Sequence, residues 1–101
     1  MANYNEDIYN KIVMCYDISE KIKVEILKLD GISENDRFDV LMPIVEKIKN
    51  IADILMEKYV ILLRDKNNSI RSEIVTILDQ FLEYIAIYKN RLYEIYNNNE
   101  K

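Results

Sequence analysis

The 101 residues are enough for one folded domain and too few for two domains with separate cores. Hydrophobic residues make up 50% of the chain and charged residues 32%, which is the balance of a globular protein and not of a disordered one. The formal net charge is −4 and Lys and Arg form no cluster, which argues against nucleic acid as the main ligand. We therefore expect a single domain over residues 1–101.

The cysteine and histidine contents restrict the chemistry further. One cysteine cannot form an intramolecular disulfide, and a chain without histidine has no Cys/His spacing for zinc. Residues 1–11 are polar and acidic, unlike a signal peptide, and charges interrupt every apolar stretch before it reaches membrane-spanning length. We expect a cytoplasmic protein with no membrane partner, no metal ion and no cofactor.

The first predicted helix covers residues 4–29. Asn3 and Glu6 have the spacing of a capping box. Apolar side chains then recur at alternating steps of four and three, which places them on one face of a helix. This stripe contains Ile8, Ile12, Cys15, Ile22, Ile26 and Leu29. Ser19 is its polar member, and Gly31, the only glycine, is expected to end the helix in the left-handed conformation.

The second predicted helix covers residues 36–64, and Ser33 or Asp36 can cap its start. Its apolar series consists of Leu41, Val45, Ile48, Ala52, Leu55, Tyr59 and Leu62. Pro43 lies inside this pattern, where it removes a backbone donor and costs about 3 kcal/mol in a straight helix. Two alternatives follow: one kinked helix, or a short helical turn followed by a new helix that begins at Pro43.

The third predicted helix covers residues 69–97 and follows a polar break whose length favours an antiparallel neighbour. Its apolar series consists of Ile74, Leu78, Phe81, Ile85, Tyr88, Leu92 and Ile95. The chain has no alternating pattern typical of β-strands and no internal repeat. We predict an all-α fold, an elongated up-down-up antiparallel three-helix bundle.

Catalysis is not expected from these residues. Histidine, the easiest general acid or base at neutral pH, is absent, so an enzyme would need a carboxylate or lysine with a displaced pKa. The Asp and Glu residues mostly lie opposite the apolar stripes, which is typical of a solvated surface. Cys15 lies on the inner stripe, where a thiol in apolar surroundings is inert. We predict no catalytic residue, no small-molecule substrate and no enzymatic activity.

The remaining features concern association with a partner. Ile54 and Ile61 are seven residues apart on the outer side of the second helix, and Ile87 occupies the matching side of the third. They are either scattered surface isoleucines or a seam for another helix, in a homodimer or from a client. Tyr9 and Tyr16 join these candidates because tyrosine is favoured at interfaces, although it also packs at the rim of a bundle.

Two functional hypotheses follow. The first is a non-enzymatic protein–protein interaction module, either an adaptor or a secretion-chaperone-like protein by analogy of fold and charge alone, whose partner is another protein or a second copy. The second is an acidic regulatory inhibitor or antitoxin-like protein, for example a phage-borne one, that occupies a basic site on an enzyme. They differ in salt dependence, because only the acidic inhibitor should lose affinity steeply as salt rises.

Overall fold

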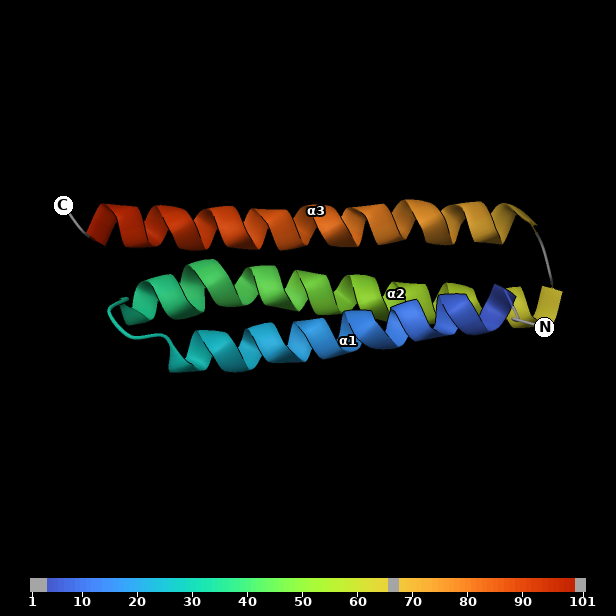
Figure 1. Ribbon diagram of the computed structural model, residues 1–101, viewed down its shortest axis with the longest axis horizontal. Coiled ribbons are helices and arrows are strands. Elements are labelled where there is room, and N and C mark those ends of the chain that lie inside the picture. Colours follow the sequence, from blue (N-terminus) through green and yellow to red (C-terminus); the bar gives the residue numbers. More distant parts are fainter. Residues whose placement is uncertain (1–3, 66–67, 100–101) are drawn as a thin grey trace.

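The computed structural model describes residues 4–65 and 68–99, and it confirms an all-α, up-down-up three-helix bundle (Figure 1). The helical elements in chain order are α1 (Tyr4–Lys28), the short π-helix η1 (Asp36–Leu41), α2 (Met42–Asp65) and α3 (Asn68–Asn99). α2 runs antiparallel to α1 and α3 and lies between them in the view of Figure 1. The bundle is elongated, with extents of 53 × 22 × 20 Å.

The loop between α1 and η1 contains both predicted local signals. Gly31 has a φ of 79°, the left-handed conformation that ends a helix without the steric penalty of a side chain. The hydroxyl oxygen of Ser33 accepts a hydrogen bond from the backbone N–H of Asp36 at 3.0 Å, as an N-cap residue does. The predicted capping residue of the first helix, Asn3, lies outside the described residues.

Arg37 adds a contact across this loop that the sequence analysis did not anticipate. Its guanidinium donates hydrogen bonds to the backbone carbonyl oxygen of Ile26 and, at 2.8 Å, to that of Leu29. The last carbonyls of a helix lack donors from the following turn, and a cation there also complements the helix dipole. One side chain of η1 therefore caps the end of α1 and fixes the two segments relative to each other.

Pro43 is accommodated by a wider turn of helix and not by a new start. The backbone N–H of Met42 donates to the carbonyl oxygen of Arg37, five residues earlier. A π-helical turn of this kind inserts one extra residue immediately before the proline, whose ring would otherwise press on the carbonyl of Asp39, four residues back. The chain passes directly from η1 into α2, which fits the predicted kinked helix.

The core runs along α2, which packs against both α1 and α3. Its fully buried side chains include Ile12, Ile26, Leu41, Ile48, Leu55, Leu62, Ile74 and Phe81. Ser19 is tolerated within the apolar stripe because its hydroxyl donates to the Tyr16 carbonyl oxygen at 2.8 Å. The backbones of α1 and α3 hardly approach each other, so side chains alone fill the space between these two helices.

Candidate functional site

Hydrogen bonds from two tyrosine hydroxyls connect α3 to α1 and to the loop after it, along one half of the edge between the two helices. Tyr88 donates to the Glu25 carboxylate at 3.3 Å, and Tyr96 donates to the Asp30 carbonyl oxygen at 3.1 Å. Burial, followed by the negative charge of Glu25, raises the pKa of Tyr88 well above its usual value, so the hydroxyl remains a donor. These bonds tie α3 to the end of α1 that is nearest the loop before η1.

The other half of the same edge is open. An opening of about 370 Å³ lies between α1 and α3, and we call it the α1/α3 opening. Its apolar lining consists of Met14, Cys15, Ile18, Val75, Leu78, Phe81 and Leu82. Met14, Val75 and Leu82 are 59%, 58% and 64% exposed. Lys11 and Asp79 are the charged residues of the lining, so the opening is an apolar hollow with few charges at its margin.

Cys15 lies in the lining of the α1/α3 opening but is itself only 5% exposed. Burial raises the pKa of its thiol to about 11, so the thiol is protonated at neutral pH. A protonated thiol is a poor nucleophile and a poor metal ligand. The predicted core position of Cys15 is confirmed, and the α1/α3 opening offers apolar contact and not thiolate chemistry.

The edge between α1 and α2 carries two of the predicted partner-binding residues, Tyr9 and Tyr16. The Tyr9 ring packs against the Tyr59 ring with centroids 5.6 Å apart, and the Tyr16 hydroxyl donates to Asp53 at 2.6 Å. Burial raises the pKa of Tyr16 to about 12, and the hydrogen bond to Asp53 and the charges of Asp53 and Glu57 add to the effect. Both tyrosines therefore bridge α1 and α2, while the Tyr9 ring remains exposed.

A groove continues along this edge toward the loop before η1. It has a volume of about 340 Å³ and lies between α1, η1 and α2; we call it the α1/α2 groove. Its lining combines apolar and charged side chains: Ser19, Glu20, Lys23, Leu27, Phe38, Met42, Val45, Glu46 and Lys49. Leu27 and Phe38 are 52% and 49% exposed. The groove thus offers apolar contacts beside carboxylates and ammonium groups.

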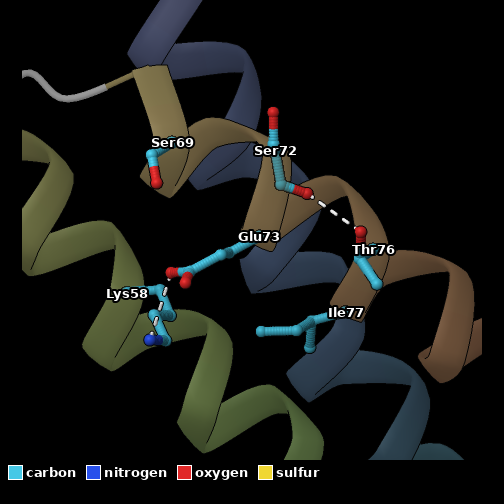
Figure 2. Close-up of a pocket in the computed structure, with 6 residues that line it drawn as sticks. All are labelled: Lys58, Ser69, Ser72, Glu73, Thr76 and Ile77. Carbon is cyan, nitrogen blue, oxygen red and sulfur yellow. Dashed lines mark hydrogen bonds and ion pairs between the residues drawn. The ribbon is translucent and has the colours of Figure 1, made fainter.

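The hollow between α2 and α3 is polar and open (Figure 2). Its lining residues are Lys58, Ser69, Ser72, Glu73, Thr76 and Ile77. Lys58 and Glu73 point toward one another and form an ion pair at 3.2 Å, and the Thr76 hydroxyl donates to the Ser72 carbonyl oxygen at 3.0 Å. Because its main charges already pair with each other, this hollow gives less reason to expect a ligand than the two grooves beside α1 do.

The predicted isoleucines Ile54, Ile61 and Ile87 are exposed, but the structure does not gather them into one patch. The Lys47 ammonium lies 5.7 Å from the centre of the Tyr84 ring, so Lys47 of α2 and Tyr84 of α3 lie at about the same position along the bundle axis. Ile54 follows Lys47 and Ile87 follows Tyr84, but the two helices run in opposite directions. Ile54 and Ile87 therefore lie on opposite sides of this position, about 15 Å apart along the bundle axis. Only Ile54 and Ile61 share a face, and Tyr9 and Tyr16 lie on a different edge.

Comparison with known protein families, characterised proteins and solved structures found no match to this chain. In the segments that the structure describes, no group of three or more Cys, Asp or Glu side chains is placed to hold a metal ion. No helix within those segments is both long and apolar enough to cross a membrane.

The α1/α3 opening was missed by the sequence analysis. Val75 and Leu82 are seven residues apart, the same spacing that singled out Ile54 and Ile61, so they share one face of α3. Met14 lies outside the apolar stripe of α1 and carries no such spacing. The shared face of Val75 and Leu82 could have been recognised from the sequence. That these residues lie opposite Met14 depends on the distance between α1 and α3, which are far apart in the chain.

Proposed function

We propose that this chain is a non-enzymatic protein–protein interaction module of the adaptor type, which receives an amphipathic helix of another protein in the α1/α3 opening. One observation supports the proposal above all: three large apolar side chains, Met14, Val75 and Leu82, are more than half exposed around an apolar hollow. Exposed apolar groups gathered around a hollow are a common mark of a protein-binding surface. Helix-in-groove binding uses contacts of this kind.

The arrangement of the helices favours a helical ligand. α1 and α3 run parallel to each other (Figure 1), so a helix laid antiparallel between them would cover the open edge as a fourth helix covers a bundle. The lining extends from Lys11 to Ile18 of α1, which is about 11 Å of helix, or about two turns. A span of that length accommodates the two or three anchoring residues of an amphipathic helix.

The size and charge of the opening favour another protein's helix over a second copy of the whole bundle. A stable dimer buries about 800 Å² on each partner, far more than two turns of α1 and α3 supply. The lining contains one charged group of each sign, Lys11 and Asp79, and Lys11 forms its ion pair with Asp7 at 3.3 Å. Binding in the opening should therefore depend on apolar contact and should respond weakly to salt.

The test compares two double variants in affinity purification from the source cells. Met14→Ser with Leu82→Ser should lose a bound protein that the wild-type chain retains, whereas the control, Ile54→Ser with Ile61→Ser, should retain it. A photo-reactive residue in place of Val75 should then crosslink to a helical segment of that protein. Equal retention by both double variants, crosslinking of the chain to a second copy of itself, or turnover of the retained molecule would each contradict the proposal.

A further inference from the structure

We infer that the α1/α2 side of the bundle is a second docking surface, which binds a positively charged amphipathic helix of a partner protein. This inference does not depend on the α1/α3 opening, because the two surfaces lie on different sides of α1. We call the second surface the α1/α2 face. Its exposed apolar side chains include Tyr9, Val13, Leu27 and Phe38.

The apolar groups of the α1/α2 face lie at its two ends. Tyr9 packs on Tyr59 at one end, and Val13 follows one turn later on the same side of α1. Leu27 and Phe38 line the α1/α2 groove at the other end. Tyr9 and Leu27 are about 27 Å apart along α1 at the usual helical rise, which matches a partner helix of about five turns.

Charged side chains occupy the middle of the α1/α2 face. Glu20 and Glu46 line the groove together with Lys23 and Lys49, and Asp53 and Glu57 lie beside Tyr16. Four carboxylates thus face two ammonium groups, which leaves an excess of two negative charges. A helix with apolar residues at both ends and basic residues between them complements this arrangement.

These charges are available to a partner. Glu20, Glu46 and Glu57 make no ion pair within 4.0 Å among residues 4–65 and 68–99, and neither do Lys23 and Lys49. Asp53 accepts the hydrogen bond from the Tyr16 hydroxyl, and this bond involves no cationic side chain. A basic helix would therefore gain charge pairs on this face without breaking existing ion pairs.

The hollows on the other two sides of the bundle are each lined by one carboxylate and one ammonium group. These are Asp79 and Lys11 at the α1/α3 opening, and Glu73 and Lys58, which pair with each other, between α2 and α3. On the α1/α2 face, by contrast, four carboxylates lie beside exposed apolar side chains. Charge complementarity selects a basic helix there and disfavours an acidic one.

The inference can be tested with two labelled model peptides of about 21 residues, which as helices are about 31 Å long and span the distance from Tyr9 to Leu27. The basic probe is three repeats of Leu-Lys-Lys-Leu-Leu-Lys-Leu, and the acidic control has Glu in place of each Lys. Fluorescence anisotropy with the full chain should show at least about tenfold tighter binding of the basic peptide, and that binding should weaken as salt rises from about 50 mM to about 500 mM. Equal affinity for the two peptides, or no binding of the basic peptide, would overturn the inference.

Matched variants locate the binding site of the basic peptide. Glu20→Gln with Glu46→Gln should weaken binding about fivefold to tenfold, whereas Asp65→Asn with Glu83→Gln, which removes the same charge from exposed positions outside the α1/α2 face, should change it less than about twofold. Equal losses in the two double variants would mean that net charge alone attracts the peptide. A loss only in Met14→Ser with Leu82→Ser would place the peptide in the α1/α3 opening and would refute the second surface.

Discussion

Tyr16 of α1 donates its hydroxyl to the Asp53 carboxylate of α2 at 2.6 Å, and this bond ties the two helices together in the middle of the α1/α2 face. We expect Tyr16→Phe to lower the free energy of unfolding by about 1 kcal/mol, because it removes a hydrogen bond to a charged group at a partly exposed site. Urea denaturation measures the change. Tyr93→Phe is the control, because the Tyr93 side chain is 69% exposed, and a loss of the same size in that variant would contradict the assignment.

Stability should fall in alkaline solution. The pKa of Cys15 is raised from 9.0 to about 11, and that of Tyr16 from 10.0 to about 12. The folded state therefore holds both protons more tightly than the unfolded state, so the stabilisation is complete below the unfolded values and is lost as the pH rises through the folded ones. The melting temperature should decline between about pH 9 and pH 12, and Tyr16→Phe should reduce the decline above pH 10. A melting temperature that stays constant over this range would refute the prediction.

Arg37 should contribute more to stability than most exposed charged residues. Arg37→Met removes both donors to the carbonyl oxygens of Ile26 and Leu29, and we expect a loss of about 2 kcal/mol. Arg37→Lys keeps the charge but supplies a single ammonium in place of a planar fork, so it should recover only part of the loss. Thermal denaturation of the two variants measures the difference, and full recovery by Lys would mean that charge alone is responsible.

Two neighbouring residues of α2 should respond very differently to truncation. Leu55 is 0% exposed and Ile54 is 43% exposed. Leu55→Ala should cost about 3 kcal/mol because it leaves a cavity in the core, whereas Ile54→Ala should change stability by less than about 1 kcal/mol. Denaturation should be measured at several protein concentrations. A large, concentration-dependent effect of Ile54→Ala would show that this residue is buried in a dimer, as the seam hypothesis for Ile54 and Ile61 requires.

Gly31 should be sensitive to any added side chain because of its backbone conformation and not because of crowding. Its φ is 79°, and a Cβ atom built at this position meets no other atom within 4 Å. Gly31→Ala should therefore cost about 1 kcal/mol, the usual penalty for a left-handed residue other than glycine, and Gly31→Asn should cost less. Chemical denaturation measures both losses, and an unchanged stability of Gly31→Ala would mean that the positive φ imposes no penalty.

Local features of the fold could be derived from the sequence alone. The steps of four and three in residues such as Ile12, Ile48 and Phe81 predicted the helices and the side of each that is buried. Gly31 and Ser33 predicted the end of one helix and the start of the next. These predictions succeeded because helical hydrogen bonds, caps and faces depend on residues within one or two turns of each other.

Only the tertiary structure decided how the surfaces are arranged. The register between α2 and α3 places Ile87 away from Ile54, and the gap between α1 and α3 leaves Met14 and Leu82 exposed beside the core. The reach of Arg37 to the end of α1 depends on the same packing. Helical periodicity determines which side of each helix is apolar, but the level and separation of two helices follow from the fit of all their side chains together. The sequence therefore determined the helices, and their packing decided which apolar groups a partner can reach.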